Sequence, residues 1–272
     1  MTIAEKLTKI ADNEQKVYDA GYERGYHDGE IVGGGSYDQG FEDGKDKEHE
    51  AFWDVYMPDN IVNSQYIFYS PRWTDENFYP NKDIKLKGGA TFAFSSHRIT
   101  NLKQRLIDCG VTLDTSGVTS GNYMFCFCSV LTHLPTISLL GLTEQVNNMF
   151  EDNKAMIEVE KIILKDDGST TFVRWFNNCN ALTTIAFEGV IGQNINFQWS
   201  TLLTRPSIES IVNHLSDTAS GKTLTLSKLA ADNAFPCPME DGNGGWINVG
   251  CGGNGEWLEL VATKSNWQIS LV

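Results

Sequence analysis

Residues 124–137 read MFCFCSVLTHLPTI, residues 149–162 read MFEDNKAMIEVEKI and residues 175–185 read WFNNCNALTTI. The three segments share one pattern, because the same kinds of residue recur three, six and nine positions after each Phe. The Phe residues lie 25 and 26 positions apart. A fixed period of this length indicates a solenoid, in which each unit buries its apolar face against its neighbours. The predicted repeat core is Phe125, Leu131, Leu134, Phe150, Met156, Val159, Phe176, Leu182 and Ile185.

Each predicted unit has two parts. The segment around the Phe is expected to form an irregular or 3₁₀ turn, and the segment of the type Leu131–Ile137 a short parallel strand. Cys128 and Cys179 occupy the position at which the middle unit has Asn153, which indicates a ladder of small buried residues. Stacked repeats present surfaces for binding. The pattern therefore favours recognition or assembly over catalysis.

The flanking segments predict an α+β chain with four parts. Residues 1–50 form an attachment segment, the aromatic-rich residues 51–100 an N-terminal cap with one degenerate repeat, and residues 101–205 the solenoid. Ile195–Trp199 is expected to be the last strand of the stack. Residues 206–272 are expected to form a C-terminal α/β cap, with helices near 206–215, 229–235 and 256–263 and strands at 223–226 and 267–271.

The N-terminal segment carries signals of self-association. Residues 2–20 show an apolar seam at heptad-like spacing, too narrow to stabilise an isolated helix. Glycines recur every fourth residue after it, which in a helix allows close approach of another backbone. A flexible linker over residues 21–50 and packing of the helix on its own domain are the alternatives. The predicted oligomerisation residues are Ile3, Leu7, Ile10, Val17, Gly21 and Gly25.

Charge and hydropathy exclude several classes of function. The chain of 272 residues has a net charge of −14, of which residues 1–60 carry −9. Nucleic-acid binding is not expected, because it requires clusters of Lys and Arg. No apolar run approaches the ~20 residues needed to span a bilayer, and the N-terminus lacks a signal-peptide pattern. We expect synthesis and folding in a cytoplasm.

The chain lacks the motifs of the common catalytic and metal sites. None of the six cysteines forms a CxxC pair, and no nucleophile elbow, phosphate-binding loop or zinc-protease motif is present. The cysteines are expected to be buried free thiols, with a Cys237–Cys251 disulfide as the alternative. No cofactor, metal or catalytic residue is predicted, although paired carboxylates that meet only in the fold remain an alternative.

A Gly-rich loop over residues 236–255 interrupts the C-terminal cap. Loops that carry an aromatic residue on a rigid scaffold are candidate contact sites. The predicted surface-contact residues are Asp241, Asn243, Trp246 and Asn254.

The repeats resemble BspA-type leucine-rich repeats, and the chain is similar to leucine-rich-repeat tail proteins encoded by phages of gut Firmicutes. The likeness covers nearly the whole chain except residues 22–46 and 236–255. The stretches that carry it are MTIAEKL (1–7) with YDAG (18–21), AFWD (51–54), WTDENF (73–78), RITNLK (98–103), ILKDDGS (163–169), FEGVIG (187–192), EWL (256–258) and LVATK (260–264) through Leu271-Val272.

The resemblance implies a virion structural or host-adhesion role and supplies no catalytic residues. We therefore expect a tail-fibre or baseplate-associated protein, made in the bacterial cytoplasm and located in the virion. Its expected partners are other copies of itself, for which a trimer is one option, other tail proteins and a bacterial surface glycan or protein. A purely structural tail protein and a glycan-active enzyme are the alternative functions.

Overall fold

The computed structural model describes residues 64, 67–69, 71, 73–144, 146–241 and 246–272. The chain divides into two compact units, Met1–Ala51 and Phe52–Val272, and the described residues all belong to the second unit. The predicted attachment segment, with its oligomerisation residues Ile3, Leu7, Ile10, Val17, Gly21 and Gly25, lies outside the described residues.

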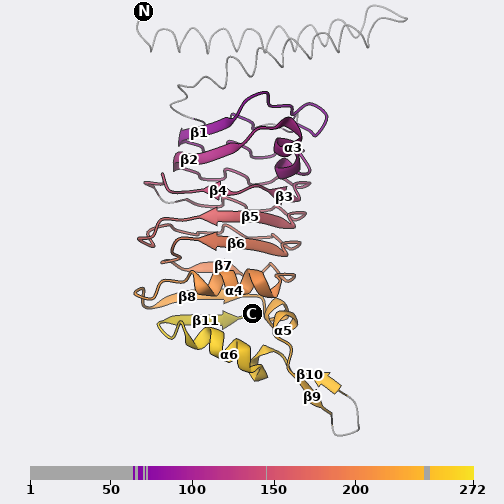
Figure 1. Ribbon diagram of the computed structural model, residues 1–272, viewed down its shortest axis with the longest axis vertical. Coiled ribbons are helices and arrows are strands. Elements are labelled where there is room, and N and C mark those ends of the chain that lie inside the picture. Colours follow the sequence, from indigo (N-terminus) through magenta and orange to yellow (C-terminus); the bar gives the residue numbers. More distant parts are fainter. Residues whose placement is uncertain (1–63, 65–66, 70, 72, 145, 242–245) are drawn as a thin grey trace, which may run out of the picture. The chain divides into compact units, whose positions relative to one another are not determined.

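The described part mixes helices and strands (Figure 1). In chain order its elements are β1 (Ile84–Gly89), α3 (Leu102–Cys109), β2 (Leu113–Ser120), β3 (His133–Leu134), β4 (Ile137–Ser138), β5 (Glu158–Ile163), β6 (Thr184–Glu188), β7 (Ile195–Phe197), α4 (Arg205–Asn213), β8 (Lys222–Leu226), α5 (Lys228–Ala234), β9 (Pro238–Glu240), β10 (Trp246–Asn248), a 3₁₀ turn (Cys251–Gly253), α6 (Gly255–Ala262) and β11 (Trp267–Leu271).

Parallel pairing between successive chain segments organises this unit. Strands β3 and β4 pair with β5, and β5 pairs with β6, all in parallel. The register aligns the residues nine positions after each Phe, because Leu134 pairs with Val159 and Val159 with Ile185. Figure 1 shows these strands lying one above the next along the unit. The period read from the sequence is thus the distance along the chain between neighbouring strands.

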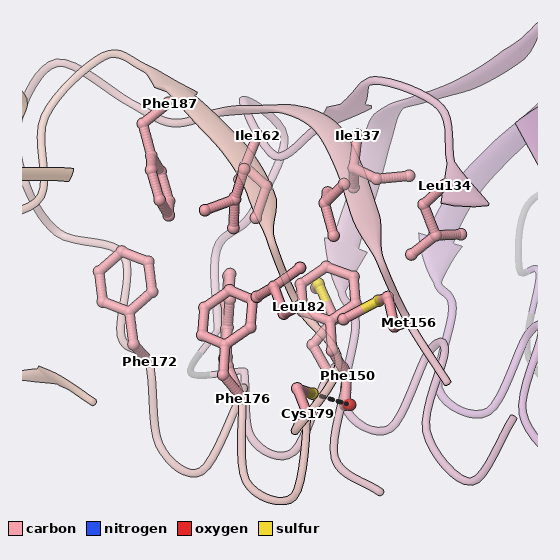
Figure 2. Packing of buried hydrophobic residues seen from close by; sticks show 14 of the residues in the cluster. Leu134, Ile137, Phe150, Met156, Ile162, Phe172, Phe176, Cys179, Leu182 and Phe187 are labelled. Carbon is pink, nitrogen blue, oxygen red and sulfur yellow. Dashed lines mark hydrogen bonds between the residues drawn. The ribbon is translucent and has the colours of Figure 1, made fainter. Parts of the chain in front are cut away.

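A column of stacked rings runs through the interior on the side away from these strands. Phe94, Phe125, Phe150 and Phe176 stack in series with centroid separations of 5.2, 5.9 and 5.4 Å. Phe68 extends the column at one end, and Phe197 at the other. In Figure 2, Phe150 and Phe176 enter the core from one side, while Ile137, Ile162 and Phe187 enter from the other. Such ring pairs contribute about 0.5–1.5 kcal/mol each beyond the burial of their area.

All nine predicted repeat-core residues lie in this interior, each 0% or 1% exposed. The residue three positions after the Phe is small, and it also donates a hydrogen bond. Cys128 Sγ donates to the carbonyl of Phe94 at 3.1 Å, Asn153 Nδ2 to that of Phe125 at 2.7 Å, and Cys179 Sγ to that of Phe150 at 3.1 Å. This position therefore requires a hydrogen-bond donor that reaches the preceding unit.

The turns around the Phe residues use an unusual backbone conformation. Among the described residues, eight that are not glycine have positive φ, and all of them lie two positions before or after a Phe of the column. Six of their N–H groups donate to the following unit, as in Tyr123 N to Asn147 O at 3.0 Å and Phe127 N to Glu151 O at 2.9 Å. The left-handed region costs an L-residue roughly 1–2 kcal/mol, which these hydrogen bonds between units offset. The eight residues are Phe92, Ser96, Tyr123, Phe127, Asn148, Asp152, Arg174 and Asn178.

The C-terminal end differs from the expectation in two respects. The Ile195–Trp199 segment is not the last strand, because β7 pairs in parallel with β8 and β8 with β11. Polar and apolar residues alternate in Thr223–Leu226, so Leu224 and Leu226 are buried on one face of β8. This apolar face allows β8 to form a further layer next to β7. The Gly-rich loop contains an antiparallel hairpin, β9–β10, and a 3₁₀ turn. The three C-terminal helices form where the sequence predicts them.

Candidate functional site

One surface of the repeats, here called the strand side, is formed by the outward residues of β3, β5 and β6. It is charged. Lys103 Nζ lies 2.8 Å from Glu158 Oε1 and 3.2 Å from Glu160 Oε1, and His133 Nε2 lies 3.8 Å from Glu158 Oε2. Farther along, Lys161 pairs with Glu188 at 3.0 Å. In this cluster two carboxylates, those of Glu158 and Glu160, converge on one ammonium group.

The ionisation of Glu160 does not suit a general acid. The hydrogen bond to Glu158 raises the pKa of Lys103. Partial burial raises the pKa of Glu160, but hydrogen bonds from Lys103 and Thr136 outweigh it and lower the pKa overall. Glu160 therefore stays ionised at neutral pH, whereas a general acid needs a raised pKa. The arrangement is that of a partly exposed ion-pair network.

The surface over the Phe column, here called the turn side, consists of the left-handed turns and the outward residues of β7 and β8. Its first part is aromatic. Phe92 and Tyr123 stack at 4.9 Å with ring planes 8° apart, and Tyr69 meets Phe92 edge-on at 5.9 Å. Tyr69 and Phe127 are 48% and 47% exposed. These rings project outward from the positions that flank Phe94 and Phe125.

The middle part of the turn side holds charged side chains that bond to other side chains of the same surface. Glu151, 5% exposed, accepts Arg174 Nη2 at 2.7 Å and also bonds Asn148 Nδ2. Asp152 Oδ1 accepts Asn178 Nδ2 at 2.7 Å. The contact between Asn148 and Glu151 lies within one unit, and the other two contacts join that unit to the next.

The last part of the turn side contains a pocket of about 280 Å³. None of its lining side chains is ionisable. Asn194 Oδ1 accepts from Thr223 N and Asn196 Oδ1 from Gln198 N, both at 2.8 Å, which fixes the two amides. Their amide nitrogens and the hydroxyls of Thr223 and Thr225 have no hydrogen-bond partner within the described ranges. The lining residues are Phe172, Val173, Asn194, Ile195, Asn196, Thr223 and Thr225.

Strand alternation explains how the sequence builds this pocket. In the register of β7 and β8, Ile195 pairs with Leu224 and Asn196 with Thr225. Ile195 and Leu224 are buried, so Asn196 and Thr225 lie on the outer face. Val173, 49% exposed, borders the pocket from the preceding unit. Sequence analysis identified both strands but not their pairing, and so it missed the pocket.

Of the four predicted contact residues, Asp241, Trp246 and Asn254 lie in the described part of the chain. Asp241 is exposed beyond β9, and Asn243 lies outside the described residues. Trp246 begins β10, where its backbone pairs with Glu240. Asn254 is the N-cap of α6, where its Oδ1 accepts from Trp257 N at 3.0 Å and its Nδ2 donates to Pro236 O at 2.8 Å. Its amide is used by the fold, because a helix start needs such an acceptor.

The cysteines in the described part of the chain are unpaired. All six cysteines are free, Cys237 and Cys251 included. Burial raises the pKa of Cys126 to about 11 and that of Cys179 to about 12, so both stay thiols. No group of three or more His, Cys, Asp or Glu residues there is placed to hold a metal ion. No helix among these residues is both long and apolar enough to cross a membrane.

Comparison with known proteins adds no family to this description. No protein-family model matches the chain, and neither a curated protein nor a solved structure does.

Proposed function

We propose that this chain is a tail-associated structural protein of a bacteriophage virion, a tail-fibre or baseplate component that adheres to the host surface through a leucine-rich-repeat solenoid. The resemblance in sequence to leucine-rich-repeat phage tail proteins supports the virion assignment. The registered parallel strands and the continuous ring column support the solenoid, because each layer is completed by its neighbours.

The observation that carries the adhesive role is the turn side. It combines exposed aromatic rings with a pocket of uncharged hydrogen-bonding groups, and in its middle part Glu151 and Arg174 form an ion pair. Exposed aromatic and amide groups on a rigid scaffold are typical of recognition surfaces. The protein is proposed to bind through this side without changing its ligand.

The two alternative functions make different predictions. A glycan-active enzyme needs one carboxyl group that can donate a proton. The converging pair, Glu158 and Glu160, instead shares the ammonium group of Lys103. A purely structural tail protein would need no side with free hydrogen-bonding groups. The geometry therefore favours adhesion over both alternatives.

Assembly is proposed to depend on residues 1–50, which would join copies of the chain, with a trimer as the working copy number, and attach them to other tail proteins. Comparing the solution mass of the full chain with that of residues 51–272 tests this. A trimer that becomes a folded monomer supports the role of the segment. The same number of copies per particle with and without residues 1–50 contradicts it.

The adhesive role is tested by adding fluorescently labelled full-length chain to intact cells of a panel of gut Firmicutes. Saturable binding to at least one strain, with no release of reducing sugar from its wall material, is the expected result. Sugar release would favour the enzyme. Absence of binding to every strain would favour the purely structural tail protein.

A further inference from the structure

We propose that the pocket between β7 and β8 is a subsite for one neutral sugar ring of a surface glycan. The inference deepens the proposed adhesive function and rests on it for the source of the glycan. The ligand class itself follows from the chemistry of the pocket.

The lining selects an uncharged ligand. Its polar groups are amides and hydroxyls, and no ionisable side chain belongs to it. The neighbouring cation on β8, Lys222, donates to Gln193 Oε1 at 2.8 Å. Phosphate and carboxylate ligands are usually held by Arg, Lys or helix N-termini, none of which lines this pocket. An anionic group would therefore lose its hydration without gaining a counter-charge.

The free groups match a ring that carries several hydroxyls. The amide nitrogens of Asn194 and Asn196 donate hydrogen bonds, and the hydroxyls of Thr223 and Thr225 both donate and accept. A sugar hydroxyl likewise donates and accepts hydrogen bonds, so it can pair with an amide nitrogen or with a threonine hydroxyl of the pocket. Because backbone N–H groups already hold both Asn oxygens, the two amides are fixed before a ligand arrives, which lowers the entropy cost of binding.

Size and apolar surface limit the ligand to about one ring. The volume of about 280 Å³ lies just below the ~300–1,000 Å³ of sites for drug-sized ligands. Val173, half exposed at the rim, provides an apolar patch for the C–H face of a ring. A single weakly held ring suits adhesion by many copies in one virion, because avidity multiplies low affinities.

Titration of the full-length chain with neutral and anionic sugars tests the assignment. The probes are glucose, galactose, mannose, N-acetylglucosamine and glucuronic acid, followed by saturation-transfer NMR and calorimetry. At least one neutral sugar is expected to bind with a Kd on the order of 1 mM, equivalent to about −4 kcal/mol. Glucuronic acid is expected to bind at least about ten-fold more weakly than its neutral counterpart glucose.

Two variants locate the binding. The double variant Thr223→Val and Thr225→Val removes both hydroxyls and keeps β-branched side chains in the strand. Asn196→Asp keeps the oxygen that accepts Gln198 N and replaces the amide donor. Each is expected to weaken neutral-sugar binding by about five-fold or more, the equivalent of one lost hydrogen bond. Thr184→Val, at an exposed position of β6, is the matched control and should leave the Kd unchanged.

The outcomes separate this proposal from the adhesive function. The pocket assignment is overturned if no neutral sugar binds the folded chain, or if both pocket variants bind as the control does. If the pocket variants bind cells as well as the unaltered chain does, the pocket is not the adhesive site. The proposed adhesive function would still hold in that case. Sugar binding at the pocket without binding to any cell would support the subsite and contradict the adhesive function.

Discussion

The strand side and the turn side are built on the same repeat units, yet they are held together by different interactions. On the strand side, Lys103, Glu158 and Glu160 form partly exposed ion pairs. Beneath the turn side, buried rings stack, and buried donors such as Asn153 bond to a carbonyl of the preceding unit. Exposed ion pairs contribute little to stability, whereas buried groups cost much when they lose a partner. The turn side should therefore be sensitive to substitution and the strand side tolerant.

The largest effect is expected from a gap in the ring column. Phe150→Ala removes a fully buried ring that stacks on both Phe125 and Phe176. The free energy of unfolding should fall by about 3–5 kcal/mol, measured by urea denaturation. Phe127→Ala, which removes a ring 47% exposed on the same side, is the control and should cost less than about 1 kcal/mol. Equal losses in the two variants would show that the column does not support the fold.

Acid should destabilise the turn side through His97. Burial lowers the pKa of His97 to about 3 from 6.5, although the carboxylate of Asp75 opposes the shift. The unfolded chain then binds the proton more readily, so stability is lost as the pH falls from 6.5 towards 3, by several kcal/mol in all. Nδ1 accepts Ile99 N at 3.1 Å, and buried Nε2 has no partner in the described part.

The variant His97→Asn isolates this contribution, because its side-chain oxygen can still accept Ile99 N. Urea midpoints measured between pH 7 and pH 4 should fall less steeply for the variant than for the unaltered chain. Parallel slopes would mean that carboxyl groups, and not His97, account for the acid sensitivity.

A smaller loss is expected when the donor between units is removed. Asn153→Ala leaves Phe125 O without its donor and Cys128 N without its acceptor, both in the core. The free energy of unfolding should fall by roughly 2–4 kcal/mol. Asn153→Cys, the residue of the neighbouring units, should recover part of this loss, since Cys128 and Cys179 donate to the same kind of carbonyl. If the Cys variant were no more stable than the Ala variant, the shared role of this position would be refuted.

The same contrast explains what could be predicted from the sequence. The Phe, Leu131-type and Leu134-type positions were predictable because the chain repeats these core residues at a fixed spacing. The donor role of Asn153 was not, because a buried Asn and a buried Cys look alike only once the carbonyl that they bond is known. Nor were the left-handed turns, since Phe, Tyr and Arg are unusual in that conformation.

The pocket was the least predictable feature of all. Asn194 and Thr223 lie 29 positions apart, outside the regular repeats, and only the pairing of β7 with β8 brings them together. For Asn254 a usable signal was present: an Asn before Gly255-Glu256-Trp257 is a helix-start pattern. The prediction of Asn254 as a contact residue instead followed from the glycine content of the segment. The residues that line the pocket do not recur at the repeat spacing. A periodic pattern in the sequence therefore predicts core residues but not the residues of this pocket.

The smallest effect is expected on the strand side. Lys103→Met removes the ammonium group that joins Glu158 and Glu160 and keeps a long apolar stem. The loss of stability should be at most about 1 kcal/mol, because the three side chains are partly exposed and the free carboxylates can be hydrated. The loss should shrink in 1 M salt, where the Debye length is about 3 Å. Sugar binding should not change, since no residue of this network lines the pocket. A loss as large as that of Asn153→Ala, or a change in sugar affinity, would mean that the two sides are coupled and that the strand side also contributes to recognition.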